Sequence, residues 1–340
     1  MEYRKLGGSG LMVPALTLGT ATFGGGNEFF RKWGDTDVRE ATSMIDAALE
    51  MGCNLFDTAD AYSAGLSEQI LGAAIDGRRD KVLLATKTGM AMDEGVNSMG
   101  TSREKIVRSC EASLKRLGTD YIDLYQLHSF DAMTPIEEML HALDDLTRAG
   151  KIRYFGVSNY AGWQLMKMLS LADRLALPRP VTHQVYYTLT DRDFEWELMP
   201  LGIDQNVGTL VWSPLAGAKL SGKVGRSKAA PADSRAATDA SWDIPTERLF
   251  AVTDVLETLS AELGHSIPQI ALAWLLSRPT ISSIVIGARN LAQLQDNLAA
   301  TQVQLSEAQI ARLDAASAVR PPYPYWHQRR TFLRRNPPPV

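Results

Sequence analysis

Short apolar runs alternate with amphipathic helical patterns along most of the chain. The runs that predict strands are Ala15–Gly19, Cys53–Phe56, Val82–Ala85, Ile122–Leu127, Ile152–Val157, Thr182–Tyr186, Thr209–Trp212 and Ser283–Ile286. The clearest predicted helices between them are Val38–Met51, Arg103–Leu117, Ile136–Arg148 and Gly162–Arg174. Apolar strands separated by helices are typical of a parallel sheet whose faces are covered by those helices.

Start and stop signals support several of these helices. Ser102 stands where an N-cap is expected and Gly118 follows the last leucine of the same pattern. Thr134 and Pro135 precede the next helix, and Gly150 follows it. Small hydroxyl residues and proline favour helix starts and glycine favours helix ends, so these boundaries are predicted with a physical reason.

Two α/β folds fit this alternation: a closed (β/α)8 TIM barrel and an open, doubly wound sheet. An open dinucleotide-binding sheet would carry G-x-G-x-x-G after its first strand, whereas Gly19 is followed by TATFGGG, which lacks that spacing. We therefore predict a TIM barrel over about residues 15–318, in a single domain spanning 1–340. A β-hairpin, Tyr3–Leu6 and Val13–Leu18 around a glycine-rich turn, is expected to precede the barrel.

Two segments fall outside the alternation. Lys219–Trp242, after the seventh strand, is rich in Gly, Ser, Ala and basic residues, and a long loop at that place is expected to be functional or mobile. The tail 319–340 is rich in Pro and Arg and lacks helical periodicity, so it is expected to be extended.

Composition narrows the class of protein. The 340 residues are 45% hydrophobic and carry a formal net charge of −4, which argues against a nucleic-acid partner. No run approaches the roughly 20 apolar residues that span a bilayer, and no secretory signal opens the sequence. Cys53 and Cys110 lie in apolar stretches, as expected of reduced core thiols. We expect a cytoplasmic protein without a membrane partner, either a monomer or a homo-oligomer.

Polar residues follow nearly every predicted strand. Reading outward from each run gives Asp57, Lys87, His128, Ser158-Asn159, Gln184, Trp212-Ser213 and Gly287-Ala288-Arg289. The carboxyl ends of TIM-barrel strands meet at one face, which is where active sites form. Any one of these residues could instead cap a turn or point to solvent, but together they predict a site.

The same strand ends carry a resemblance to a known family. The segments concerned are FDTADAY, LATKTG, DLYQLH, GKIRYFGVSNY, HQVYY, WSPLAG and VIGARN. Their order and residue types resemble the motifs of the aldo-keto reductases, and the likeness runs from about Tyr3 to Ala316. The resemblance implies a catalytic tetrad of Asp57, Tyr62, Lys87 and His128.

The chemistry of these four residue types suits carbonyl reduction. A tyrosine hydroxyl titrates near pH 10, and a neighbouring ammonium stabilises the phenolate and lowers its pKa. Lys87 is expected to do this for Tyr62, with Asp57 holding Lys87 charged. His128 is expected to donate a hydrogen bond to the carbonyl oxygen. The resemblance implies this division of roles, and the spacing permits it.

The resemblance also implies an NADPH/NADP⁺ site. Ser158, Asn159 and Gln184 would bind the nicotinamide carboxamide, and Trp212, where many relatives carry Tyr, would stack on the ring. Arg289 would fork onto the 2′-phosphate of NADPH, while Gln293 and Asn297, four residues apart, would bracket the adenine. The other predicted cofactor contacts are Gly19, Thr20, Ser213, Leu215, Gly217, Lys223 and Gly287.

The substrate is expected to be a small molecule with an aldehyde or ketone group, such as a sugar, a steroid-like compound or a natural-product or fungal-toxin ketone. Phe23, Trp33 and Phe130 lie in loops above the predicted barrel mouth and are expected to contact an apolar substrate, or else to pack those loops shut.

Two other functions remain open. Potassium-channel β subunits belong to the same superfamily, so a regulatory NADP(H)-binding subunit is the main alternative; the intact tetrad favours an enzyme. A metal-dependent barrel enzyme is the other, but the five histidines show no HxH or HExxH pairing. We expect no metal site.

Overall fold

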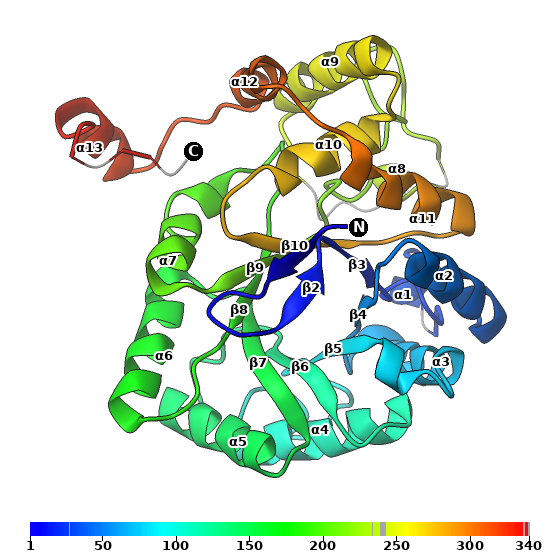
Figure 1. The fold of residues 1–340 in the computed structure, drawn as a ribbon, viewed down its shortest axis with the longest axis vertical. Coiled ribbons are helices and arrows are strands. Elements are labelled where there is room, and N and C mark those ends of the chain that lie inside the picture. The colour runs from blue at the N-terminus through cyan, green and yellow to red at the C-terminus, as the bar shows by residue number, and fades with distance from the viewer. Residues whose placement is uncertain (27, 233, 239–242, 336, 339–340) are drawn as a thin grey trace.

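The strands close into a parallel barrel with the helices outside it. The computed structural model describes residues 1–26, 28–232, 234–238, 243–335 and 337–338. The barrel strands are β3 (Leu16–Gly19), β4 (Leu55–Asp57), β5 (Leu83–Thr88), β6 (Ile122–Leu127), β7 (Ile152–Ser158), β8 (Thr182–Tyr186), β9 (Gly208–Trp212) and β10 (Ile281–Ile286). They pair in chain order and β10 closes onto β3, so the predicted TIM barrel is confirmed (Figure 1).

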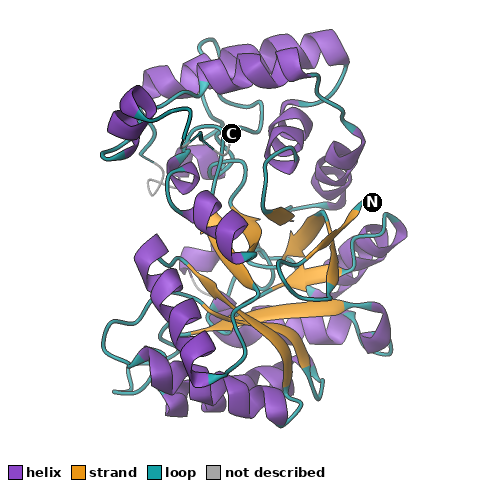
Figure 2. Ribbon diagram, turned by 60° about the vertical axis from the view of Figure 1, so that its left-hand side comes forward, coloured by secondary structure: helices purple, strands orange, loops and turns teal. Residues whose placement is uncertain are grey.

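Helices follow the strands and cover the outside of the barrel (Figure 2). They are α2 (Val38–Glu50), α3 (Leu66–Ala74), α4 (Arg103–Leu117), α5 (Ile136–Arg148), α6 (Gly162–Leu175), α7 (Leu198–Gln205), α9 (Thr246–Leu263), α10 (Ile267–Leu276), α11 (Leu291–Leu298) and α12 (Glu307–Ala316). The Ser102 side chain accepts a hydrogen bond from the Lys105 amide and Gly118 ends α4 in the left-handed conformation, as the sequence predicted.

Shorter elements lie in the connections. These are the helices α1 (Glu28–Arg31), α8 (Arg235–Thr238) and α13 (Tyr325–Thr331), and the 3-10 turns η1 (Tyr62–Gly65), η2 (Arg79–Lys81), η3 (Asp193–Glu195) and η4 (Ala299–Gln302). The segment expected to be a functional loop, Lys219–Trp242, contains α8, and its residues 233 and 239–242 lie outside the described residues.

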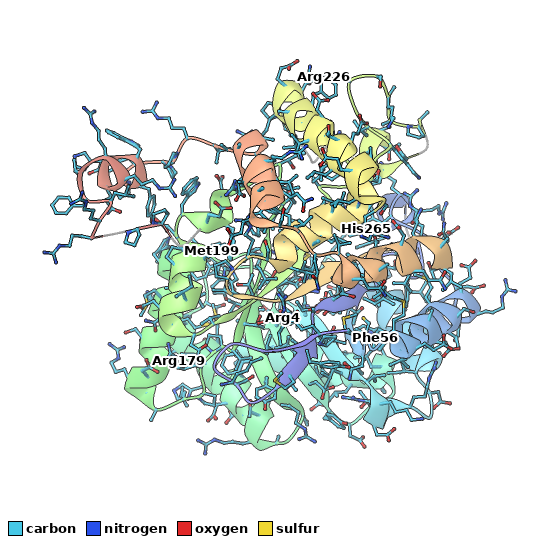
Figure 3. The ribbon with its side chains drawn as sticks, turned by 45° about the horizontal axis from the view of Figure 1, so that its top comes forward. Arg4, Phe56, Arg179, Met199, Arg226 and His265 are labelled. Atoms are coloured by element: carbon cyan, nitrogen blue, oxygen red, sulfur yellow. The ribbon has the colours of Figure 1, made fainter. Side chains whose placement is uncertain are left out.

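The predicted N-terminal hairpin is also confirmed and covers the amino ends of the strands. It consists of β1 (Tyr3–Lys5) and β2 (Met12–Pro14), which pair antiparallel. Arg4, labelled in front of the barrel in Figure 3, donates hydrogen bonds of 3.0 Å to the carbonyls of Leu276 and Ile281. Leu6 and Val13 pack onto apolar residues inside the barrel. With the amino end of its interior sealed, the barrel interior opens at the carboxyl ends of the strands.

Two apolar cores result from this arrangement. A small one inside the barrel contains Leu55, Ala85, Leu124, Leu210 and Val285, together with the hairpin residues. A much larger one lies between the strands and the surrounding helices and contains both cysteines as free, buried thiols. Apolar side chains therefore fill much of the barrel interior, and the predicted site residues lie at its carboxyl end.

The C-terminal tail differs from the extended segment that was expected. It contains α13, which projects from the barrel in Figure 1. Pro324 precedes the helix, the Tyr325 ring stacks on Trp196 with centroids 6.3 Å apart, and the Arg329 guanidinium lies 5.1 Å from the Trp196 ring centroid. Docking onto Trp196, which the tail's own periodicity cannot reveal, stabilises this short helix.

Candidate active site

Two adjoining cavities open at the carboxyl ends of the barrel strands. The first, about 720 Å³, is lined by residues from β3, β4 and β7–β10 and by loops that include Phe30, Trp33 and Met90. The second, about 500 Å³, lies between the loop after β9 and the start of α11. Both are lined by Trp33, Ser213, Arg235 and Gly287. We call the first the catalytic cavity and the second the phosphate-side cavity.

A buried ion pair forms the floor of the catalytic cavity. Asp57 ends β4 and Lys87 lies near the end of the neighbouring β5, so parallel pairing brings the two side chains together. The Lys87 ammonium pairs with Asp57 Oδ1 and donates to the Thr58 carbonyl at 2.8 Å. Gln126 and Gln184 donate to Asp57 Oδ2 at 3.2 and 2.9 Å. These amides satisfy the carboxylate, which makes burial of the pair possible.

Tyr62 stands beside this pair, five residues after Asp57 in the loop that leaves β4. Its ring centroid lies 5.1 Å from Lys87 Nζ and 5.8 Å from the His128 ring centroid. Asp57, Tyr62 and His128 all line the catalytic cavity, and Lys87 is fully buried behind them. The structure therefore brings the four predicted tetrad residues together.

Burial sets the protonation states of these groups. Burial raises the pKa of Tyr62 and Asp57 adds to the rise. Lys87 acts in the opposite direction, but the net pKa still lies above its ordinary value. The expected lowering by Lys87 is present, but burial outweighs it. Burial alone lowers the pKa of Lys87, yet Asp57 and Tyr62 raise it above its ordinary value. At neutral pH the phenol keeps its proton and Lys87 its charge.

His128 is neutral in this setting. Burial, reinforced by the charge of Lys87, lowers its pKa to about 3. Its Nδ1 is buried with no hydrogen-bond partner among the described residues. A neutral imidazole has one N–H donor and one acceptor, so His128 can hydrogen-bond a carbonyl oxygen without adding a charge.

The chain belongs to the aldo/keto reductase family. The model of the Aldo/keto reductase family matches residues 15–318. An "Uncharacterized oxidoreductase YrpG" of Bacillus subtilis is 39% identical over 90% of this chain and 93% of its own length. A "Probable voltage-gated potassium channel subunit beta" of Arabidopsis thaliana is 37% identical over 89% and 92%. A "Versiconal hemiacetal acetate reductase" of Aspergillus parasiticus is 34% identical over 92% and 96%. The resemblance seen in the sequence is confirmed, and the chain is an oxidoreductase acting on carbonyls.

The polar residues predicted for the nicotinamide lie together and line the catalytic cavity along with Tyr62. Ser158 ends β7, and Asn159 follows it with a left-handed φ of 58°. The Asn159 amide donates to the His128 carbonyl at 2.9 Å and accepts from Trp212 Nε1 at 3.0 Å. Ser158 Oγ is buried without a partner among the described residues and lines the cavity. This unsatisfied hydroxyl fits a carboxamide, which has both a donor and an acceptor.

The phosphate-side cavity collects the remaining predicted cofactor residues. Leu215, Gly217, Lys223, Arg289, Gln293 and Asn297 all line it. Asn290 caps α11 by accepting from the Gln293 amide. The Arg289 guanidinium bonds the carbonyls of Lys32 and Trp33 (3.2 Å to the latter), which leaves other N–H groups for a phosphate. These residues fit the polyphosphate half of a dinucleotide.

Three predicted contacts are corrected by the structure. Phe23 is fully buried in the large core, because its amide closes a turn onto the Thr20 carbonyl and points the ring inward. Phe130 packs against Tyr160 and Trp163, with centroids 5.2 and 5.8 Å away, and lines neither cavity. Thr20 is buried beneath the site, where its hydroxyl lies 2.9 Å from that of Ser67. Gly19 does line the catalytic cavity.

Some lining residues were missed from the sequence. Phe30 lines the catalytic cavity, with its ring centroid 5.4 Å from Trp33 and 6.1 Å from Tyr62. Tyr186, the last residue of β8, packs against Trp212 at 5.1 Å and could have been found by its place at a strand end. Arg235 lines both cavities, and its guanidinium lies 4.8 Å from the Trp33 ring centroid. The basic loop was recognised, but nothing in it singled out Arg235.

Two further features, a membrane-spanning helix and a cluster of metal-ligating side chains, are absent from the part of the chain that the structure describes. Within those residues no helix is both long and apolar enough to cross a bilayer. Nor do three or more His, Cys, Asp or Glu side chains gather there as a metal site would require.

Proposed function

We propose that this aldo/keto reductase reduces an aldehyde or ketone to an alcohol with NADPH, Tyr62 being the proton donor. The observation that carries the proposal is the meeting of Asp57, Tyr62, Lys87 and His128 at the wall of one cavity. When bound, a reduced nicotinamide supplies the hydride for the carbonyl carbon. Ser158, Asn159, Gln184 and Trp212 would hold its ring.

The described residues have complementary roles in the proton step. The neutral His128 and the Tyr62 hydroxyl donate hydrogen bonds to the carbonyl oxygen and fix its position. As negative charge develops there, Tyr62 transfers its proton to that oxygen. The Lys87 ammonium stabilises the resulting phenolate, and Asp57 holds Lys87 charged and in place. Because burial raises the pKa of Tyr62, the resting phenol carries the proton that the reaction consumes.

Arg289 supports NADPH as the preferred cofactor. Arg289, Lys223 and Arg235 all line the phosphate-side cavity, and a guanidinium can pair two N–H groups with phosphate oxygens. We propose that Arg289 contacts the 2′-phosphate, which NADH lacks. Gln293 and Asn297, on one face of α11, would contact the adenine.

The aromatic wall favours a flat, apolar carbonyl compound over an open-chain sugar. Phe30, Trp33 and Tyr62 meet edge to face, and Met90 and Trp212 add apolar surface to the same cavity. Among the relatives, the "Versiconal hemiacetal acetate reductase" is named for a small-molecule substrate, which agrees with reduction of a small molecule by this chain.

Steady-state NADPH oxidation with a panel of aromatic ketones, aromatic aldehydes and open-chain sugars tests the proposal. We expect turnover of aromatic carbonyls that Tyr62→Phe reduces by about 10²-fold or more, with NADPH affinity retained. Turnover that survives Tyr62→Phe would overturn the role of Tyr62. A purely regulatory NADP(H)-binding subunit, the alternative suggested by the β-subunit relatives, would bind NADPH and turn over none of the panel.

A further inference from the structure

A second buried acid–base pair lies behind the tetrad. Asp60 and Lys105 are only 1% and 2% exposed, and Asp60 Oδ2 lies 3.8 Å from Lys105 Nζ. Neither oxygen of Asp60 makes a hydrogen bond of good geometry with the described residues, although the Thr88 hydroxyl lies close enough to lower its pKa. Burial raises the pKa of Asp60 to about 6, while Lys105 counteracts the rise. Such a pair contributes little to stability, because the loss of hydration offsets the attraction.

The loop that contains Asp60 also presents Tyr62 to the cavity. Asp60 is two residues before Tyr62, and its amide donates to the Lys87 carbonyl at 3.1 Å. Lys105 lies in the first turn of α4, so the pair joins the Tyr62 loop to a barrel helix. The other charged groups near Asp60 are Glu68 on α3 and Arg116 on α4, which pair with each other.

The turn after Tyr62 is strained. Ser63, Ala64 and Gly65 follow one another with φ of 49°, 54° and 89°. A left-handed conformation is unfavourable for residues other than glycine, here Ser63 and Ala64, so neighbouring contacts must hold the turn. On its far side Ser63 Oγ donates to the Phe23 carbonyl at 3.1 Å. On its near side the Asp60 side chain reaches Lys105.

We propose that the Asp60–Lys105 pair is a positioning element for Tyr62. It anchors the near side of the strained turn to α4 and so fixes the phenol beside Lys87 and His128. The inference rests on the proposed function, because it assigns the pair to proton transfer and not to folding or cofactor binding. Asp60 and Lys105 line neither the catalytic nor the phosphate-side cavity and act through Tyr62.

The test removes both charges together. In Asp60→Asn/Lys105→Met no buried charge is left unpaired, so we expect an unchanged or higher melting temperature. NADPH affinity and KM for the carbonyl should stay within about twofold, whereas kcat should fall about tenfold or more because the phenol is less well placed. Lys105→Arg, which keeps the pair, should retain a kcat several times that of Lys105→Met.

A control is the surface pair of Arg78, which is partly buried, with Asp46 on α2. Asp46→Asn/Arg78→Met likewise removes one acidic and one basic charge, away from the loop, and should leave kcat as in the wild type. A folded Asp60→Asn/Lys105→Met variant with wild-type kcat overturns the proposal. So does a kcat that falls equally in Lys105→Arg and Lys105→Met. If Tyr62→Phe leaves turnover unchanged, the proposed function itself is wrong. If turnover depends on Tyr62 but kcat does not change when the Asp60–Lys105 pair is removed, only this inference is refuted.

Discussion

The two adjoining cavities use charge in opposite ways. In the catalytic cavity, Asp57 and Lys87 are buried, paired and surrounded by amide donors. In the phosphate-side cavity, Arg289 lies at the surface, bonded to backbone carbonyls. Charge interactions are strong where water is excluded and weak where it enters. The first cavity is therefore suited to chemistry at one fixed position, and the second to holding a charged ligand that must also leave.

The largest effect is expected from breaking the buried ion pair of Asp57 and Lys87. Lys87→Met leaves Asp57 buried without its cation, so unfolding free energy should fall by about 3–5 kcal/mol. Turnover should fall by about 10²-fold or more, since the phenolate loses its neighbouring charge. Denaturant unfolding and steady-state kinetics measure the two losses. In Asp57→Asn/Lys87→Met stability should largely return while turnover does not; recovery of turnover would contradict the role of Lys87.

The second-largest effect is expected from acid, which should lower the free energy of unfolding. Burial lowers the pKa of His128 and His183 to about 3. An unfolded histidine titrates near pH 6.5, so this contribution to stability is complete above about pH 6.5 and is lost progressively as the pH falls towards 3. At pH 5 each of the two histidines should lower the free energy of unfolding by about 2 kcal/mol relative to pH 7.

Urea unfolding at pH 7 and pH 5 checks this expectation. The difference should be about 2 kcal/mol smaller in His183→Gln, whose amide oxygen can still accept from the Tyr160 amide as His183 Nε2 does. Equal differences in the two proteins would show that His183 is not held neutral.

A smaller and more selective effect is expected at the phosphate-side cavity. Arg289→Ala should raise the Kd of NADPH about tenfold, the amount expected for one charged hydrogen bond, and leave the Kd of NADH within about twofold. Fluorescence titration with both cofactors measures this. Arg312, an exposed arginine paired with Glu262 on α9, provides the control through Arg312→Ala. Equal weakening of NADH and NADPH would rule out a 2′-phosphate contact.

The smallest effect should come from salt. Raising ionic strength from about 0.05 M to 0.5 M screens exposed charges, so the Kd of NADPH should rise a few-fold. The value of kcat at saturating cofactor should hardly change, because the ion pair beneath Tyr62 is shielded from solvent. A kcat that falls in parallel with affinity would show that the two cavities do not differ as described.

Prediction from sequence succeeded wherever the relevant signal was local. The order of apolar runs gave the barrel, and the residues one or two positions after three of these runs are Asp57, Lys87 and His128. It failed where direction mattered: Phe23 turns into the core, and Phe30, seven residues later in the same loop region, lines the cavity. Both are aromatic residues in a glycine-rich stretch, and no periodicity distinguishes them.

The amino-acid sequence by itself determined the fold and the family, because hydrophobic spacing and the residues at strand ends are properties of short segments. Only the tertiary structure decided that the pKa of Tyr62 is raised, that Arg235 reaches both cavities and that Asp60 meets Lys105. Each of these depends on how deeply a side chain is buried and on which distant segment packs against it. Those quantities exist only once the chain has closed into a barrel.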